Sequence, residues 1–415
     1  MLRRFETPSL APRMRSPRPT PTLSLLVALA VAPATPPTPV SAQLPSGAER
    51  VWSELAADWR ASVEREGVVG SSIALVHEGR LVKLEATGMA DLERGRPVDA
   101  ETIYHWASIT KTFTAIAIMQ LRDRGLLALG DPIVRYVPEL RDVHNPFGSM
   151  EAITIRHLLS HSAGFRAGTW PWGGDRDWHP HEPTEWSQLV AMIPYTEILF
   201  PPGSQYSYSN PGIIFLGRVI ERVSGDVYEA YVEKNIFRPL GMRAAYFDVT
   251  PWHLLDHRAN HYFVRAGEPV AGGVDFNTGI TVSNGGLNAP VTDMARYLAF
   301  LMGNPIEGAD FDSVLKRSSL EEMWRPVVEM GRTSTSVRSM GLSFFLTEQG
   351  GGTIVGHTGT QRAFLSYFYI DPAAKVGVIA AFNTVAEDQT GPDTDGLRAR
   401  TTRRFLEELF PAFRR

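Results

Sequence analysis

Segments with the pattern of β-strands lie near both ends of this 415-residue chain, and helical patterns fill the middle. Near the N-terminus, 71–76 and 81–86 are rich in apolar and β-branched residues and flank a short turn at 77–80. Towards the C-terminus, four short runs of the same kind are spread over 342–382 and end at Gly, Pro, Asp or Asn. These runs can join one sheet only if the two ends of the chain meet.

Helical spacing of apolar residues covers 47–66, 397–409 and much of 153–250. The simplest packing is an α+β fold, an α/β sandwich. It has one antiparallel sheet built from both chain ends and flanked by helices, with a mainly helical lobe inserted. A cleft between two lobes is a usual place for a functional site. The expected parts are a domain over 43–412 with an α/β lobe, about 47–120 and 285–412, and a helical lobe, about 121–284.

The composition excludes several classes of protein. The chain contains no Cys, so it cannot use thiol catalysis, Cys-ligated zinc or disulfides. Its formal net charge of −4 argues against a nucleic-acid-binding surface. A domain of this size does not need disulfides for stability, so the lack of Cys is compatible with export.

The first 42 residues have the pattern of a secretory signal peptide. A basic start is followed by a short apolar core, 23–32, and by small residues that offer a cleavage site before Gln43. An uncleaved membrane anchor or a disordered tail are the alternatives. The apolar core is shorter than the ~20 residues of a spanning helix, and no later stretch is long and apolar enough. We therefore expect an exported protein, periplasmic or extracellular, with no stable membrane span after cleavage.

A Ser-x-x-Lys pair, Ser108 and Lys111, opens an apolar helical stretch. On a helix this spacing places both side chains on one face. A Lys in apolar surroundings is harder to charge, so its amine can take a proton from a neighbouring hydroxyl. The same spacing recurs at Ser313 and Lys316 within a charge-rich stretch, where it is typical of an exposed helix face. The motif alone is therefore only a hypothesis, and Ser108 needs partners elsewhere in the chain.

Two later stretches offer such partners. Tyr208 and Asn210 lie two apart in a loop rich in Gly and Pro. The phenol can move a proton if a nearby cation lowers its pKa, and the amide can orient a substrate carbonyl and hold Lys111. The alternative is a turn with a buried Tyr and a capping Asn.

The second stretch, 356–360, lies at the junction of two C-terminal strands. Gly359 allows a substrate backbone to approach the strand closely. The N–H of Thr360 can join that of Ser108 as an oxyanion hole for acyl transfer. An ordinary strand with a Gly bulge is the alternative.

In this order, Ser-x-x-Lys, Tyr-x-Asn and a His-Thr-Gly strand resemble the motif set of the serine β-lactamase and penicillin-binding-protein superfamily. The variants present, with Tyr208-Ser209-Asn210 and His357-Thr358-Gly359, are similar to the class C branch with its esterase and peptidase relatives (peptidase S12 type). The resemblance covers about 47–412. Further similar segments are 155–164, 239–242, 285–287 and Asp293.

The resemblance implies a β-lactamase/transpeptidase-like fold and an acyl-enzyme mechanism. Ser108 attacks a carbonyl, and Lys111 and Tyr208 share the base and acid roles, with the first base left open. Asn210 positions the substrate and the Lys111 amine. The implied partner is a small-molecule or short-peptide substrate, and neither a metal nor an organic cofactor is needed. The oligomeric state is left open.

One departure concerns the strand motif, because His357 stands where class C β-lactamases carry Lys. A His is mostly neutral at pH 7 unless its pKa is raised, so it is a poorer partner for a carboxylate. We therefore expect at best weak β-lactamase activity and favour a peptidase, carboxypeptidase or esterase. Arg362 is a candidate to supply the missing charge, with an exposed strand-edge Arg as the alternative.

Other polar groups are interpreted as structural or as specificity features. The loop 169–187, with four Trp residues, is a candidate wall of the cleft or a self-packed surface loop. Its acidic and His residues match no trusted metal-ligand spacing. His157 and His161 lack the Glu of the zinc-hydrolase motif and are expected to be structural.

Two functions follow. The first is an exported serine hydrolase that forms an acyl-enzyme at Ser108 on an amide or ester. The second is a penicillin-binding-like sensor or binding module that is acylated without turnover.

Overall fold

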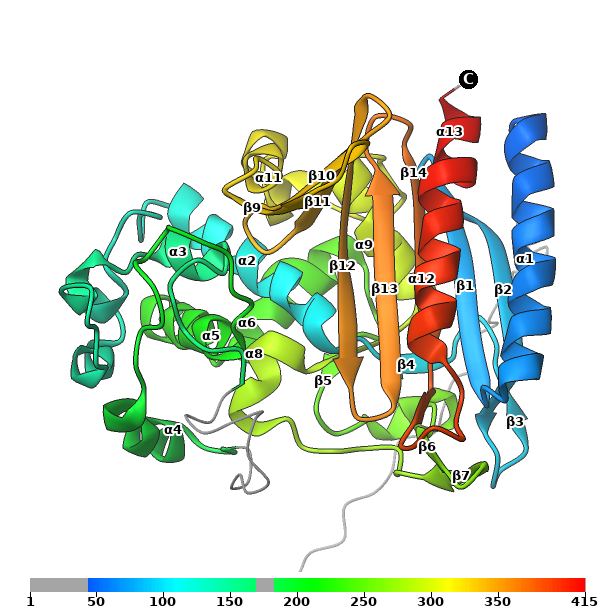
Figure 1. Ribbon diagram of the computed structural model, residues 1–415, viewed down its shortest axis with the longest axis horizontal. Coiled ribbons are helices and arrows are strands. Elements are labelled where there is room, and N and C mark those ends of the chain that lie inside the picture. Colours follow the sequence, from blue (N-terminus) through cyan, green and yellow to red (C-terminus); the bar gives the residue numbers. More distant parts are fainter. Residues whose placement is uncertain (1–43, 169–182, 415) are drawn as a thin grey trace, which may run out of the picture. The chain divides into compact units, whose positions relative to one another are not determined.

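The main sheet of the computed structural model, which describes residues 44–168 and 183–414, joins both ends of the chain (Figure 1). It has nine strands in the order β3-β2-β1-β14-β13-β12-β11-β10-β9, and neighbouring strands are antiparallel. The meeting point is the pair of β1 and β14, where Ser71 lies opposite Phe382. The strands are β1 Gly70–His77, β2 Arg80–Asp91, β3 Arg96–Pro97, β9 Val328–Arg332, β10 Ser336–Met340, β11 Phe345–Gln349, β12 Gly352–Gln361, β13 Phe364–Asp371 and β14 Val376–Phe382. The predicted α+β architecture is thus confirmed.

Helices cover both faces of this sheet. Alternate residues of β1 point to opposite faces: Ile73 and Leu75 pack in one core with α1 and α12, while Ala74 and Val76 belong to the other core with α2 and α9. This division follows from the two-residue period of a strand. The bounds are α1 Ser46–Glu66, α2 Thr110–Asp123, α9 Val291–Met302 and α12 Thr394–Arg404.

The central part of the chain is mainly helical, as expected, and lies beside α2 (Figure 1). Thr154 caps α3 by accepting a hydrogen bond from the N–H of His157, and this helix begins within the range 153–250 where helical spacing was expected. The longest helix of this part, α5, begins at Asn210 behind the capping hydroxyl of Ser209. The helices of this part are α3 Ile155–Leu159, α4 Trp186–Met192, α5 Asn210–Ser224, α6 Tyr228–Val232, α7 Arg238–Leu240 and α8 Val282–Gly285. Later in the chain follow α10 Phe311–Val314, α11 Arg317–Met323 and α13 Phe410–Phe413.

Several strands were not expected from the sequence. The β9–β10 hairpin extends the sheet, although its Ser, Arg and Glu content gives little apolar alternation. Two three-stranded sheets, β15-β6-β7 and β4-β8-β5, join distant segments. Their bounds are β4 Ile103–His105, β5 Tyr246–Phe247, β6 Tyr262–Arg265, β7 Glu268–Ala271, β8 Leu287–Pro290 and β15 Thr384–Ala386.

No helix in the described part of the chain is both long enough and apolar enough to cross a membrane.

Candidate active site

Ser108 stands in a short 3₁₀ turn, Ala107–Ile109, between β4 and α2. Trp106, directly before the turn, is held by two hydrogen bonds to β8. The Trp106 N–H donates to the carbonyl of Leu287 at 2.8 Å, and the indole N–H donates to the carbonyl of Ala289 at 2.8 Å. Ala107 has φ +48°, a left-handed conformation that non-glycine residues seldom adopt. The half-buried Ser108 is therefore presented by a backbone turn that neighbouring strands hold in place.

Lys111 lies on the first turn of α2, directly beside Ser108. Its Nζ is 2.9 Å from the Ser108 Oγ and donates to the backbone carbonyl of Asn284 at 2.7 Å. The side chain is fully buried, and burial lowers the pKa of the amine well below its ordinary value. Among the described acidic residues, none forms an ion pair with it that would offset this shift. The geometry places a base next to a hydroxyl.

Tyr208 approaches the same hydroxyl from the loop that precedes α5. Its phenol interacts with the Ser108 side chain, and its ring centroid is 5.0 Å from the Lys111 Nζ. Burial raises the pKa of Tyr208, and the contact with Ser108 offsets this only in part. The sequence-based idea of a phenol whose pKa is lowered by a cation is therefore not what the structure shows. The phenol keeps its proton at neutral pH.

Asn210 is the first residue of α5, and its backbone links two neighbours. Its N–H donates to the carbonyl of Ala167 at 3.1 Å, and its carbonyl accepts from the Asn284 side chain at 3.5 Å. The Asn210 side chain makes no hydrogen bond to another described residue, and Lys111 is held by Ser108 and Asn284 instead. The Asn210 side chain was expected to hold Lys111, but in this structure it forms no hydrogen bond with the Lys111 amine.

The strand β12 passes Ser108 with one edge open. Its pairing with β11 ends at Gly356, whereas its pairing with β13 continues to Gln361. A Cβ on Gly359 would lie 2.3 Å from the Trp106 carbonyl oxygen and 3.1 Å from the Ser108 nitrogen. The absence of a side chain therefore lets the strand lie directly against the turn of Ser108 and leaves its backbone available there.

His357 is fully buried on β12 and stacks on Phe345, with ring centroids 4.6 Å apart. Its Nδ1–H donates to the carbonyl of Thr358 at 2.6 Å, because a carbonyl can only accept. Burial, and then the neighbouring Lys111, lower the pKa of His357 to about 3. The imidazole is thus neutral at physiological pH, and this position carries no cation.

Arg362 lies outside this cluster. It is exposed in the two-residue turn between β12 and β13, with φ +53°, and its guanidinium lies over the ring of Phe276 at 5.5 Å. No described acidic group pairs with it, and it makes no recorded contact with Ser108, Lys111 or Tyr208. Arg362 is a surface cation at the end of the strand.

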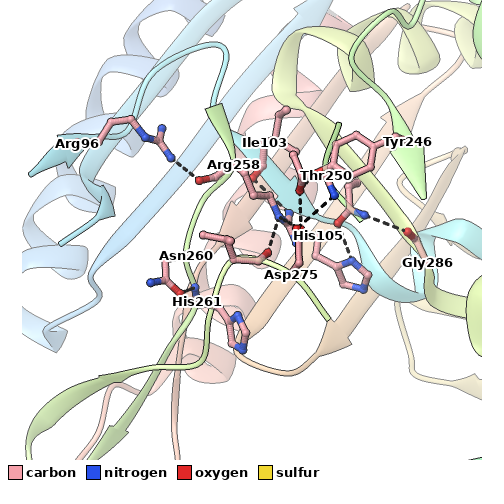
Figure 2. A network of polar contacts seen from close by, with 12 residues as sticks. Arg96, Ile103, His105, Tyr246, Thr250, Arg258, Asn260, His261, Asp275 and Gly286 are labelled. Atoms are coloured by element: carbon pink, nitrogen blue, oxygen red, sulfur yellow. Dashed lines mark hydrogen bonds and ion pairs between the residues drawn. The ribbon is translucent and has the colours of Figure 1, made fainter. Parts of the chain in front are cut away.

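A network of buried polar contacts includes His105 and Arg258 (Figure 2), and we call it the polar brace. His105, three residues before Ser108, has its Nδ1 2.9 Å from the Asn288 side-chain oxygen and its Nε2 3.0 Å from the Gln361 side chain. Burial, followed by the charge of Arg258, lowers the pKa of His105 to about 4. A neutral ring of this kind ties β4, β8 and β12 together around the candidate site.

Arg258 is the buried cation of this brace (Figure 2). Its Nε donates to the carbonyl of Val274 at 2.9 Å and lies 4.0 Å from Asp275. A guanidinium nitrogen donates to the carbonyl of Ile103 at 3.4 Å, which fixes the start of β4. The brace was not predicted, because its members are dispersed in sequence and match no motif.

Of the remaining sequence predictions, the structure tests the second Ser-x-x-Lys pair, and two others lie wholly or largely outside the described residues. Ser313 lies at the end of the short helix α10 and Lys316 precedes α11, so this second Ser-x-x-Lys pair shares no helix face. The signal-peptide hypothesis for 1–42 falls outside the described residues. The same holds for most of the Trp-rich loop, 169–182.

Comparison with known proteins shows which family the chain resembles in sequence. The β-lactamase family model matches residues 55–403. Esterase EstB from Burkholderia gladioli is 29% identical over 371 residues, covering 80% of this chain and 90% of the relative.

Solved structures agree. An octameric penicillin-binding protein homologue from Pyrococcus abyssi matches with a TM-score of 0.69 at 29% identity, covering 83% of this chain and 75% of that one. A class C β-lactamase matches with a TM-score of 0.68 at 19% identity, covering 89% and 98%. The fold and the comparisons define a serine hydrolase. The chain belongs to the β-lactamase family.

Proposed function

We propose that the chain hydrolyses carboxylic esters, or amides of similar shape, through an acyl-enzyme at Ser108. The observation that carries this proposal is the 2.9 Å contact between the Ser108 Oγ and the buried amine of Lys111. An amine whose pKa is lowered by burial can accept the hydroxyl proton as Ser108 attacks a carbonyl carbon.

The proton then moves from the nucleophile to the leaving group. As the Ser108 oxygen bonds to the carbonyl carbon, its proton passes to Lys111. When the bond to the leaving group breaks, the departing oxygen or nitrogen takes a proton from the Tyr208 phenol, and the Lys111 ammonium returns one to Tyr208. A water molecule releases the acyl group by the reverse steps. Because its pKa is raised, the Tyr208 phenol is protonated at neutral pH and carries the proton that it is proposed to donate to the leaving group.

The oxyanion site is proposed at the backbone N–H groups of Ser108 and Thr360. The close approach of Gly359 to the Ser108 nitrogen supports this assignment, since Thr360 is the next residue on the open edge of β12. Donors aimed at the developing charge lower the barrier by several kcal/mol in acyl transfer, about 3–4 for one donor. Asn210 is proposed to orient the substrate carbonyl with its free amide.

The proposed substrate class follows from the uncharged state of the His357 ring at neutral pH. A neutral ring at this position favours an acyl group without a carboxylate, because the His357 imidazole carries no charge to pair with one. The relative named as an esterase, with 90% of its length matched, supports an ester substrate. Peptides with a terminal carboxylate and β-lactams are then slower substrates. Thr358 is proposed to contact the substrate beside His357, and Arg362 remains a surface cation at the end of β12.

Export is proposed from the sequence of residues 1–42, with its basic start, short apolar core and small-residue end. Activity in the periplasmic or extracellular fraction, with an N-terminus near Gln43, is the expected result.

The test is turnover of a short-chain nitrophenyl ester, a chromogenic cephalosporin and a D-amino-acid peptide by wild type and Ser108→Ala. We expect the ester to be the best substrate and turnover to be lost in the variant. A stoichiometric burst without turnover would instead identify an acylated sensor. Turnover that persists in Ser108→Ala would refute the proposal.

A further inference from the structure

We propose that His161 is a positioning residue that holds the Tyr208 phenol on Ser108, an inference that rests on the proposed function. His161 follows α3 and is fully buried. Its backbone carbonyl accepts from the N–H of Ser207 at 2.8 Å, and its Nδ1 accepts from the N–H of Ser209 at 3.0 Å. The residues on either side of Tyr208 are thus both tied to His161.

The ring of His161 also holds the Tyr208 ring itself. The two rings stack with centroids 4.5 Å apart and an interplanar angle of 25°. Tyr206 contacts His161 edge-on, with centroids 6.3 Å apart. Backbone hydrogen bonds fix the position of the loop, and the stacked ring fixes the plane of the phenol.

The hydrogen bond to Nδ1 determines the state of the imidazole. A backbone N–H can only donate, so Nδ1 is unprotonated and the ring proton is on Nε2. A doubly protonated ring would lose this hydrogen bond and place a charge beside Lys111. Neutral His161 is therefore the form compatible with the loop geometry.

The backbone at His161 is unusual, with φ +52°. Residues other than Gly seldom adopt this left-handed conformation, although Asn, Asp and His do so more readily than the rest, and such positions occur at turns and functional sites. A helix end would be better served by Gly or Asn here. The presence of His is explained by the two tasks of its side chain, the Nδ1 acceptor and the stacked ring.

Two substitutions separate these tasks. His161→Asn keeps a left-handed backbone and a short acceptor for the Ser209 N–H, but removes the ring. His161→Phe keeps a ring on Tyr208 and removes the acceptor. The matched control is His157→Asn, because His157 belongs to the same segment and contacts the cap of α3 rather than Tyr208.

The measurement compares an alkyl ester with a nitrophenyl ester of the same acyl group. A nitrophenolate leaves without protonation, whereas an alkoxide needs the proton that we assign to Tyr208. We expect each His161 variant to lose about tenfold or more in kcat/KM on the alkyl ester, about threefold or less on the nitrophenyl ester, and to leave KM nearly unchanged. Tyr208→Phe should show the same selective loss, and His157→Asn should show none.

Equal losses on both esters, or activity equal to wild type, would overturn the role of His161. A purely structural role predicts equal losses, since a smaller folded fraction lowers both rates alike. If His161→Phe does not fold, His161→Asn decides alone because Asn tolerates the backbone. Ser108→Ala keeps the two proposals apart: turnover in that variant refutes the nucleophile, whereas a dead Ser108→Ala with unaffected His161 variants refutes only the positioning role.

Discussion

The Nζ of Lys111 lies 2.9 Å from the Oγ of Ser108, and no described acidic side chain pairs with it. Its other partner is the backbone carbonyl of Asn284 at 2.7 Å. Because a carbonyl carries only a partial charge, it orients the amine without stabilising an ammonium as a carboxylate would. The chain therefore buries an amine in a form that is ready to accept a proton.

Burial of this amine makes stability depend on pH. We expect the free energy of unfolding of wild type to rise with pH relative to Lys111→Met, by up to about 1.4 kcal/mol per pH unit. The sign follows because the folded pKa is lowered, so the unfolded chain binds one more proton between that pKa and about 10.4. Urea unfolding at pH 7, 8 and 9 measures the difference.

Lys316→Met is the matched control, because Lys316 belongs to the second Ser-x-x-Lys pair and is exposed. Its stability relative to wild type should not change over the same range. A Lys111→Met difference that is constant from pH 7 to pH 9 would mean that the folded amine is charged. Lys111→Met should also lose esterase activity.

Gly359 tests the close contact between β12 and the nucleophile turn. In Gly359→Ala, the added Cβ would lie 2.3 Å from the Trp106 carbonyl oxygen, a backbone atom that cannot move aside alone. We expect at least about a hundredfold loss of kcat/KM, as for loss of an oxyanion donor. Gly130→Ala is the control, since nothing lies within 4 Å of its added Cβ. Near-normal activity of Gly359→Ala would show that the strand does not form the oxyanion site.

The protonation state of His357 determines how selectivity between carboxylate-bearing and uncharged esters should depend on pH. With the pKa of His357 lowered to about 3, its charge does not change between pH 5 and pH 8. The ratio of kcat/KM for a carboxylate-bearing ester to that for its uncharged isostere should therefore be constant over this range. A ratio that rises tenfold or more towards pH 5 would show that His357 gains a proton there and holds the carboxylate.

Arg362 offers a separate test of the same selectivity. Its guanidinium is exposed over Phe276, and exposed charges are screened by salt. We expect Arg362→Ala to lower the ratio of kcat/KM for the carboxylate-bearing ester to that for its uncharged isostere by about threefold at most. The effect should vanish near 0.5 M salt. A larger loss that persists at high salt would place Arg362 in the binding site.

The sequence was sufficient for the architecture and for the candidate nucleophile. Two strand-rich ends required one shared sheet, and the pairing of Ser71 with Phe382 confirms it. Spacing alone did not separate Ser108 and Lys111 from Ser313 and Lys316. They could be singled out because Tyr208-x-Asn210 and His357-Thr358-Gly359 follow them in the order of a known family.

The remainder depended on contacts that leave no pattern in the sequence. Asn284 holds Lys111 through its backbone carbonyl, which any residue could supply. His161 lacks the neighbouring Glu of the zinc-hydrolase motif, so the sequence predicts only a structural role for it. Its contact with Tyr208 leaves no pattern in the sequence, because it joins residues 47 positions apart and requires a left-handed backbone. His357 was expected to be mostly neutral, but only its burial beside Lys111 explains a pKa of about 3.

The most direct test of the acyl-enzyme is to quench the reaction with a slowly released ester and locate the acyl group by peptide mass spectrometry. We predict one acyl group per chain on the Ser108 peptide of wild type, a rate of formation that falls at least about a hundredfold in Lys111→Met, and no adduct in Ser108→Ala. An adduct on another residue, or ester turnover by Ser108→Ala, would contradict the account.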